Sequence, residues 1–293
     1  MMDTSHSAGP WLQTVVCWND PRHAERVWAN LLGPRMNHEV EKGTLTGWFL
    51  IRKSPSWLIR YAPAEPIPPE VARSAVGDIF ARAAIADHVS DVTECIYEPE
   101  TVAFGGDAAM ETVHRLFAED THHFTRYLAL LTAPGAVDRR RELSLLLNTA
   151  LMRAAQQEWF ECGDIWALVA AMRGSNNHLP DVADATALTV RQFITADPNT
   201  ALSRLNESEA DLVDSWLASY RLAGARLREL GSKGALLRGL RAVLAHIVLF
   251  SWNRIGLRLT DQRRLAAAAR DAVFSLHAAS LTLPHVPQQR SSQ

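Results

Sequence analysis

A carboxylate on the apolar face of a predicted helix is the first group in this sequence that could do chemistry. The segment Asp107 to Leu131 has apolar residues at helical spacing, and Asp120 falls inside that stripe. Burying a lone carboxylate would cost several kcal/mol or shift its pKa, so Asp120 needs a cationic or hydrogen-bonding partner. Asp120 is therefore either half of a structural ion pair or part of a functional site.

Polar residues also gather toward the end of a second predicted helix, Lys233 to Ile255. Its apolar stripe ends on Arg254, and small residues beside the stripe would let another backbone approach. We expect His246, Asn253 and Arg254 to project together into a cleft. A lone histidine in such a place is more often a satisfied core residue, so the functional interpretation depends on the convergence of all three.

A tyrosine and three histidines support narrower interpretations. Tyr220 lies on the apolar stripe of the predicted helix Ser208 to Leu230, which indicates a buried phenol with a polar partner and makes core packing the default. Three histidines are spread around their helix instead of sharing one face as in HExxH, so we predict no metal site; they are His114, His122 and His123. No GxGxxG, GxxxxGK or GxSxG pattern is present either.

The composition excludes several classes of protein. The chain has 293 residues, of which 47% are hydrophobic and 21% charged, and its formal net charge is -2. Binding nucleic acid needs a basic surface, so we expect no nucleic-acid partner. No apolar run reaches the ~18 residues of a membrane span, and the N-terminus lacks the order of a secretory signal, so we expect a cytoplasmic protein without membrane contact. Cys17, Cys95 and Cys162 lack zinc or disulfide spacing and are predicted to be buried thiols.

The elements that must position these groups form an α+β pattern. Strands are predicted at Trp11–Trp18 and Val92–Tyr97, and a hairpin joins Gly47–Lys53 to Trp57–Ala62. Helices are predicted at Arg22–Leu32, Glu70–His88, Asp107–Leu131, Asp138–Met172, Asp181–Ile194, Ser208–Leu230, Lys233–Ile255 and Thr260–Ala278. We expect a strand-rich N-terminal third with a small antiparallel sheet, packed against a helical C-terminal two thirds.

The same pattern sets the expected domain boundaries. Residues 1–10 are small and polar and are predicted to be a disordered N-terminus. Residues 11–279 are predicted to form one domain, because the chain is long enough to bury a full core. Residues 280–293 are predicted to be a disordered tail.

Three segments of the chain resemble motifs of a known family. Gly47 to Tyr61 reads GWFLIRKSPSWLIRY and is similar to paired strands that read FFIRY and HLRLR. Tyr97 to Thr121 resembles YxxExxRYGG followed by a helix with LFxxDS, and Trp252 to Ala266 resembles HMxxNRLLG. These motifs are typical of the elimination domain that ends lantibiotic dehydratases and stands alone in thiopeptide pathways. The chain thus resembles the thiopeptide-type bacteriocin biosynthesis family over most of its length, which implies the elimination-domain fold.

Departures from the motifs bear on the reaction. Elimination domains use arginines and a histidine to expel glutamate from a glutamylated serine or threonine. Arg60 keeps one arginine of HLRLR, whereas Leu58 replaces the other. Ala103 stands near the arginine of RYGG, and Leu249 stands at the histidine position, one turn after His246. Arginine forks would be needed to hold the carboxylates of glutamate, so elimination is disfavoured. In these departures the chain is most similar to thiopeptide [4+2] pyridine synthases.

That similarity implies a macrocyclase of thiopeptide biosynthesis. Its reaction would be a formal [4+2] aza-cycloaddition of two dehydroalanines in a leader-bearing, azole-containing precursor peptide. One dehydroalanine reacts through the iminol form of its preceding amide, and loss of water and of the leader peptide then gives the central pyridine. The resemblance implies no cofactor. It implies the ribosomally made precursor peptide as the partner, with other enzymes of the pathway as candidate partners.

This reaction assigns roles to the candidate residues. We expect the catalytic groups to be His246, Tyr220, Glu100 and Arg254, which would move protons or steady negative charge. We expect the substrate-binding groups to be Arg60, Trp57, Trp252, Asp120, Asn253 and Tyr97. Trp57 and Trp252 could stack on azole rings as flat walls, although core packing explains them nearly as well.

Two other functions remain open at the level of sequence. One is a stand-alone glutamate lyase that forms dehydroalanine, which the retained motifs allow. The other is a non-catalytic scaffold that binds the leader peptide and presents it to partner enzymes, which the lost motif residues allow.

Overall fold

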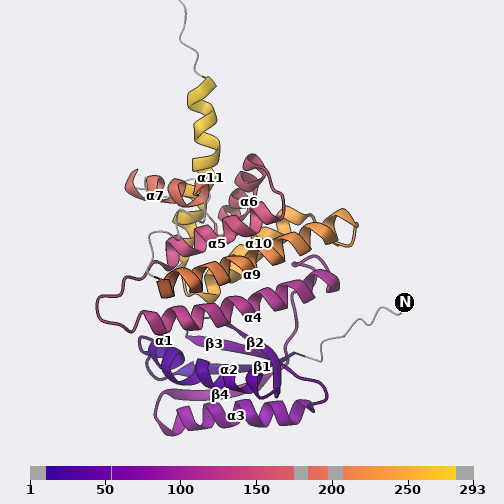
Figure 1. Ribbon diagram of the computed structural model, residues 1–293, viewed down its shortest axis with the longest axis vertical. Helices are drawn as coiled ribbons and strands as arrows, with labels where there is room; N and C mark the ends of the chain where they lie inside the picture. Colours follow the sequence, from indigo (N-terminus) through magenta and orange to yellow (C-terminus); the bar gives the residue numbers. More distant parts are fainter. Residues whose placement is uncertain (1–10, 54, 175–183, 197–206, 282–293) are drawn as a thin grey trace, which may run out of the picture.

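The N-terminal third folds as a sheet flanked by helices, and the rest of the described chain is helical, which confirms the predicted α+β class (Figure 1). The computed structural model describes residues 11–53, 55–174, 184–196 and 207–281. The disordered ends predicted at 1–10 and 280–293 lie almost wholly outside these residues. One connected hydrophobic core includes side chains from Leu12 to Val273.

Four antiparallel strands form one sheet in the order β2-β3-β1-β4. The strands are β1 (Leu12–Trp18), β2 (Leu45–Lys53), β3 (Ser56–Pro63) and β4 (Val89–Cys95). The predicted hairpin is β2–β3, and β4 begins three residues before the predicted strand. In the register of the sheet, Arg60 of β3 lies between Gln13 of β1 and Phe49 of β2. The sheet therefore places an arginine on the same face as an aromatic ring and an amide.

Helical segments flank the sheet in the N-terminal third, three short ones after β1 and a longer one after β3. They are α1 (Ala24–Val27), the π-helical turn η1 (Trp28–Leu32), α2 (Gly33–Glu41) and α3 (Pro69–Ile85). The helix predicted to end at Leu32 continues to Glu41, because Pro34 lies in the first turn of α2, where a missing backbone N–H costs nothing. Trp28 donates a hydrogen bond to Thr125, which ties this helical run to the C-terminal layer.

The C-terminal two thirds contain α4 (Asp107–Leu130), α5 (Arg140–Ala154), α6 (Trp159–Met172), α7 (Asp184–Thr195), α9 (Glu207–Ser232), α10 (Leu240–Arg254) and α11 (Leu259–Leu281). Two boundaries differ from the predictions. The helix predicted from Asp138 to Met172 is broken at Gln156, which has a φ of 55°, and α6 restarts with a capping box between Glu158 and Glu161. The helix predicted to begin at Lys233 is α10, which begins at Leu240, so residues 233–239 form a loop.

The layers are stacked so that α4 lies between the sheet and α9 (Figure 1). On the other side of the sheet lies α3. A close contact fixes α9 against α5, because a Cβ atom at Gly224 would lie 2.3 Å from the carbonyl oxygen of Leu151. The helix α10 packs against α4, α5 and β2, so it joins the helical layer to the sheet.

Two smaller findings complete the fold. None of the helices in the described residues has an apolar stretch long enough to cross a membrane. Of the three cysteines that were predicted to be buried, Cys162 is buried, whereas Cys17 and Cys95 are half-buried.

Candidate functional site

Asp120 lies at the centre of a fully buried polar network. Its Oδ1 atom accepts hydrogen bonds from Trp216 Nε1 at 2.7 Å and from the Tyr220 hydroxyl at 2.8 Å. Its Oδ2 atom accepts one from Arg254 Nε at 2.5 Å, and Asp120 and Arg254 are both 0% exposed. The cationic partner that the sequence required for Asp120 is therefore Arg254, contributed by the end of α10.

Tyr220 belongs to the same network. Its hydroxyl lies 2.8 Å from Ser251 Oγ in addition to its bond to Asp120. Burial raises the pKa of the Tyr220 phenol well above its ordinary value, and the charge of Asp120 acts in the same direction. Tyr220 is therefore a neutral phenol that orients Asp120.

Arg254 keeps unused hydrogen-bond donors in a dry environment. Its Cζ atom lies 4.1 Å from the centre of the Phe117 ring, so one face of the guanidinium is covered. Its Nη1 and Nη2 atoms are buried and have no hydrogen-bond partner among the described residues. A buried donor without a partner costs free energy, and such groups call for an explanation such as a ligand or an ordered water.

Arg60 is a second buried arginine with an unused donor. Its Nε atom donates to Gln13 Oε1 at 2.9 Å, and its Cζ atom lies 4.3 Å from the centre of the Tyr97 ring. Its Nη1 atom is 3.8 Å from Glu100 Oε2, too far for a hydrogen bond, and neither atom has another partner in the described part of the chain. Burial lowers the pKa of Arg60, and the charge of Arg254 lowers it further. The two guanidinium groups are therefore close enough for their positive charges to interact.

Tyr97 is held by a histidine that the sequence analysis considered only as a metal ligand. The Tyr97 hydroxyl lies 2.9 Å from His114 Nε2, and the His114 ring also packs against Trp11. Burial lowers the pKa of His114 to about 4, with a smaller contribution from the charge of Arg60. Burial raises the pKa of Tyr97. The pair is therefore a neutral phenol with a neutral imidazole.

His246 lies near Glu100 on the exposed side of this region. Burial lowers the pKa of the half-buried His246, and the charge of Arg238 adds to this, whereas a bond to the Ala242 carbonyl and the charge of Glu100 oppose it. Arg238 Nη1 lies 3.3 Å from His246 Nδ1. Sequence reasoning missed Arg238 because it placed residues 233–239 inside a helix.

Three phenylalanines link the histidine to the buried arginine. Phe117, under Arg254, stacks on Phe250 with ring centres 5.6 Å apart. Phe104 contacts both of these rings and also the ring of His246, at 6.1 Å. An apolar wall therefore runs from His246 to Arg254, which lowers the local dielectric around the charged groups.

Seven of the ten predicted site residues lie in this region, and three do not. The seven are Arg60, Tyr97, Glu100, Asp120, Tyr220, His246 and Arg254. Trp57 packs among Trp18, Trp28 and Arg52, and Trp252 is fully buried against Trp166. Neither indole is free to stack on a ligand, which corrects the expectation of azole-binding walls.

Asn253 also departs from its predicted place. Its side-chain oxygen accepts hydrogen bonds from Arg173 Nη2 at 2.9 Å and from Gln262 Nε2 at 3.2 Å, which joins α10 to α6 and α11. Asn253 therefore points away from Arg254, and His246 is two turns distant on α10. The expected convergence of these three side chains at one helix end does not occur, because successive positions on a helix face different directions.

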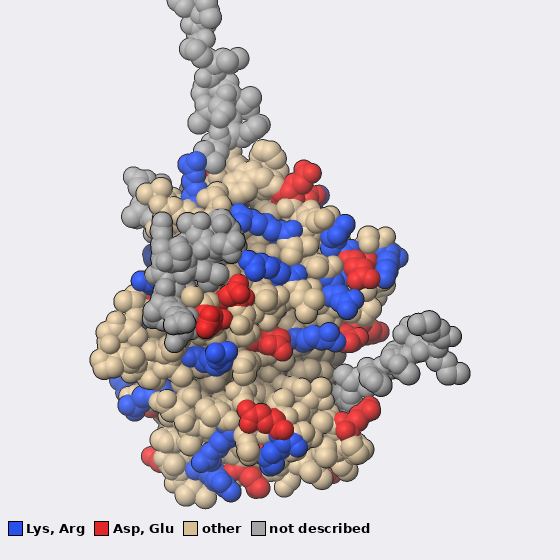
Figure 2. Space-filling view, viewed as in Figure 1, with Lys and Arg blue, Asp and Glu red and all other residues tan. Residues whose placement is uncertain are grey.

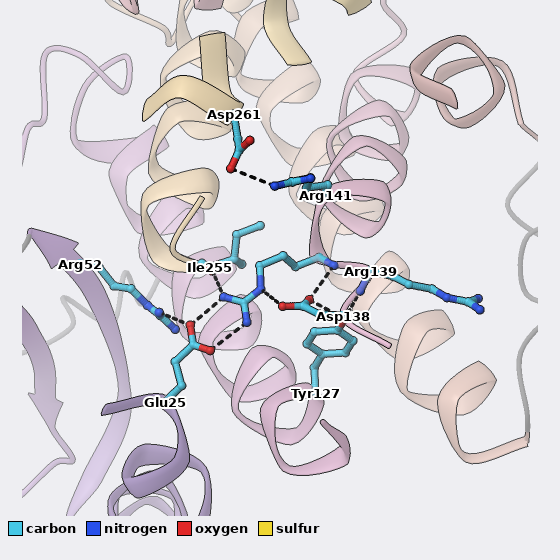
Figure 3. Close-up of polar contacts among 9 residues, drawn as sticks. Glu25, Arg52, Tyr127, Asp138, Arg139, Arg141, Ile255 and Asp261 are labelled. Atoms are coloured by element: carbon cyan, nitrogen blue, oxygen red, sulfur yellow. Dashed lines mark hydrogen bonds and ion pairs between the residues drawn. The ribbon is translucent and has the colours of Figure 1, made fainter. Parts of the chain in front are cut away.

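A second charged cluster joins the N-terminal and C-terminal layers (Figure 3). Glu25 of α1 accepts two hydrogen bonds from Arg140, at 2.7 and 2.8 Å, and a further short bond from Arg52 of β2. Arg140 also donates to Asp138 and to the carbonyl oxygen of Ile255. The cluster connects four segments of the chain, and nothing in the sequence pattern singled out Glu25.

Three surface hollows lie elsewhere. A groove of about 560 Å³ follows α4 and α9, and acidic and basic side chains both border it, among them Glu111, Arg115, Arg226 and Glu229 (Figure 2). Two other hollows lie beside residues 228–240 and between α2 and α3. None of these three is lined by any of the ten predicted residues. No three His, Cys, Asp or Glu side chains in the described chain could hold a metal ion.

Comparison with known proteins was made at the level of sequence and of fold. Residues 11–273 match the protein family described as lantibiotic biosynthesis dehydratase C-term. No curated protein matches the sequence.

Three solved structures share the fold. The tRNA-dependent lantibiotic dehydratase MibB from Microbispora sp. 107891 is 17% identical with a TM-score of 0.72, over 96% of this chain and 29% of MibB. TsrL is 16% identical with a TM-score of 0.55, over 92% of this chain and 96% of TsrL. The pyridine synthase TbtD from thiomuracin biosynthesis is 11% identical with a TM-score of 0.54, over 92% of this chain and 99% of TbtD. The chain thus spans less than a third of MibB but nearly the whole length of TsrL and TbtD.

Proposed function

Since the chain belongs to the lantibiotic dehydratase C-terminal family, we propose that it is a cofactor-independent macrocyclase of thiopeptide biosynthesis. Its substrate is a leader-bearing, azole-containing precursor peptide with two dehydroalanines. A formal [4+2] aza-cycloaddition joins them into a nitrogen heterocycle, and loss of water and of the leader as its amide gives the central pyridine. The likeness of the fold to that of the pyridine synthase TbtD, over 92% of this chain, supports this choice.

The observation that carries the proposal is the pair of buried arginines with unused donors. Arg60 and Arg254 keep buried N–H groups without hydrogen-bond partners among the described residues, and Gln13 and Asp120 fix their orientations. Donors that are already oriented in a dry site stabilise charge that develops during a reaction, because they need not reorganise. Negative charge develops on the amide oxygen as the amide becomes an iminol, and these donors are suited to hold it.

The remaining residues supply proton transfer and position. The iminol step moves a proton from the amide nitrogen to its oxygen, and later steps return protons to the departing hydroxyl and to the leader nitrogen. We assign these transfers to Glu100 on the exposed side, and we assign His246 beside it the role of a hydrogen-bond donor to the oxygen or nitrogen that becomes charged. Tyr220 and Asp120 hold Arg254, so we assign Tyr220 a positioning role in place of the predicted proton transfer. Tyr97, fixed by His114, covers Arg60.

Most of the rate enhancement should come from orientation of the peptide. Joining two ends of a flexible chain is mainly an entropic problem, and preorganisation supplies up to about 7–11 kcal/mol in well-oriented systems. A placed acid or base contributes on the order of 10²–10⁴-fold.

A glutamate lyase is the second candidate, because the same two arginines would also attract the carboxylates of a glutamyl ester. Three apolar residues oppose it at the positions where the motif carries polar ones, namely Leu58, Ala103 and Leu249. Parallel incubations separate the two functions. We expect a dehydrated, thiazole-bearing precursor to be converted, with products identified by mass spectrometry, and a glutamylated precursor to remain intact. Release of glutamate without ring closure would reverse the assignment.

A further inference from the structure

The loop between α9 and α10 is fastened to the loop that carries Glu100. The Leu237 amide donates to the Gly105 carbonyl at 2.9 Å, and Arg238 Nη1 donates to the Ala103 carbonyl at 3.2 Å. Gly105 has a φ of 93°, and a Cβ atom there would lie 3.0 Å from Val243, so the chain passes too close for most other residues. The Leu237 backbone and the Arg238 side chain are therefore both fastened to residues 103–105.

The same guanidinium contacts the candidate histidine. Arg238 Nη1 lies 3.3 Å from His246 Nδ1, and that nitrogen also lies 3.3 Å from the Ala242 carbonyl one turn earlier on α10. The two contacts exclude each other, because Nδ1 must carry a hydrogen to donate to the carbonyl and must be bare to accept from Arg238. A charged donor makes the stronger bond, so the contact with Arg238 prevails. The ring hydrogen then lies on Nε2.

The charges around His246 act in opposite directions. Arg238 faces it from the α9–α10 loop, Glu100 faces it from the loop before α4, and the ring of Phe104 covers it edge-on. The positive charge of Arg238 disfavours the imidazolium form, and the negative charge of Glu100 favours it. Removing Arg238 should therefore raise the pKa of His246, and removing Glu100 should lower it.

We propose that Arg238 is a positioning residue that keeps His246 neutral and bare at Nδ1, so that an Nε2–H donor is available to the substrate. This inference rests on the proposed function for its catalytic meaning, but its structural content does not. A neutral imidazole with its hydrogen fixed on Nε2 donates a hydrogen bond to a developing oxyanion or leaving nitrogen and keeps that proton throughout. Arg238 thus determines which ring nitrogen of His246 carries the hydrogen that faces the substrate.

Histidine NMR on the full chain tests the inference without any substrate. The His246 signals are assigned by their absence in His246→Gln, and the ring nitrogen shifts and titration are compared in wild type, Arg238→Gln and Arg238→Lys. Arg228→Gln is the matched control, because Arg228 is an exposed arginine of neighbouring α9. We expect Arg238→Gln to raise the pKa of His246 and to move its hydrogen toward Nδ1. Arg238→Lys should keep most of the charge effect, and Arg228→Gln should resemble wild type.

Activity supplies the second readout. With the dehydrated precursor, Arg238→Gln should lower kcat on the order of tenfold with little change in KM, less than the ~10²-fold expected for loss of a placed acid or base. The acid limb of the pH profile should move to higher pH by the shift that NMR records. An unchanged His246 titration in a folded Arg238→Gln protein would overturn the inference whatever the enzyme does. A shifted titration in a protein that never closes a ring would retain the inference and reject the proposed function.

Discussion

Arg140 and Arg254 are both buried beside a carboxylate, but they use their guanidinium groups differently. All three nitrogens of Arg140 donate hydrogen bonds, to Glu25, Asp138 and the Ile255 carbonyl (Figure 3). Arg254 donates through Nε alone, and its two terminal nitrogens have no partner among the described residues. The first arginine uses all its donors to hold segments together, whereas the second has two buried nitrogens whose hydrogen bonds no described residue satisfies.

Glu25 and Asp120, the carboxylates beside these two arginines, also differ in their surroundings. Burial would raise the pKa of Glu25, but hydrogen bonds from Arg140 and the charge of Arg52 lower it to about 2. Asp120 accepts from two neutral donors and one arginine, and its surroundings are fully buried. The comparison teaches that an arginine whose donors are all used indicates a structural role, whereas buried donors without partners call for an explanation such as a ligand or an ordered water. Arg52 is an intermediate case, because two of its nitrogens lack partners but Trp57 and Phe124 cover it.

The largest effect should follow the loss of Arg254. Arg254→Met leaves Asp120 buried and unpaired, so we expect unfolding free energy to fall by about 3–5 kcal/mol and ring closure to be lost. Urea unfolding and mass spectrometry measure the two effects. The double variant Asp120→Asn with Arg254→Met should recover part of the stability without recovering activity. A double variant that regains activity as well as stability would show that Arg254 is only structural.

An intermediate effect, on stability alone, is expected at the charged cluster around Glu25. Glu25→Gln removes a carboxylate that is about a third exposed, so we expect a loss of about 1–3 kcal/mol at neutral pH with kcat unchanged in the folded protein. Because the pKa of Glu25 is lowered from 4.5 to about 2, its contribution is complete above pH 4.5 and disappears as pH falls toward 2. The stability gap between wild type and variant should therefore close over that range. A gap that is constant with pH would contradict this.

The smallest effect concerns the pKa of His246, and it is separate from the drop in rate that follows when Glu100, a proposed proton-transfer group, is lost. Glu100→Gln removes a negative charge that raises the pKa of His246, so the pKa should fall and the acid limb of the rate profile should move to lower pH. This shift is opposite in sign to the one expected for Arg238→Gln. Histidine NMR and a pH–rate profile check both, and shifts of the same sign in the two variants would contradict the arrangement of charges.

Much of the fold could be predicted from the sequence, because hydrophobic periodicity reports which face of an element is buried. The hairpin β2–β3 and helix α4 were predicted nearly to their ends, and the stripe position of Asp120 correctly required a buried partner. Periodicity could not locate breaks such as Gln156, where the chain adopts a positive φ within an apolar pattern. It also could not place residues 233–239 in a loop.

The candidate site was harder to predict, because contacts between distant segments leave no local signal. Arg60, Tyr97 and Glu100, which the motifs singled out, lie side by side. Arg238, in contrast, reaches the Ala103 carbonyl from 135 positions further along the chain. His114 was visible in the sequence, but only its contact with Tyr97 gives it a role. Trp57 and Trp252 show the opposite case. The sequence suggested that they bind the substrate, but both pack in the core.

The identity of the released leader fragment tests the proposed reaction most directly. A dehydrated, thiazole-bearing precursor is incubated with the protein, and the leader fragment and core product are measured by high-resolution mass spectrometry. We predict a leader that ends in a carboxamide, formed together with a core that has lost water and closed into a pyridine macrocycle. An intact precursor, or a leader that ends in a carboxylate, would contradict ring closure as the function of this protein.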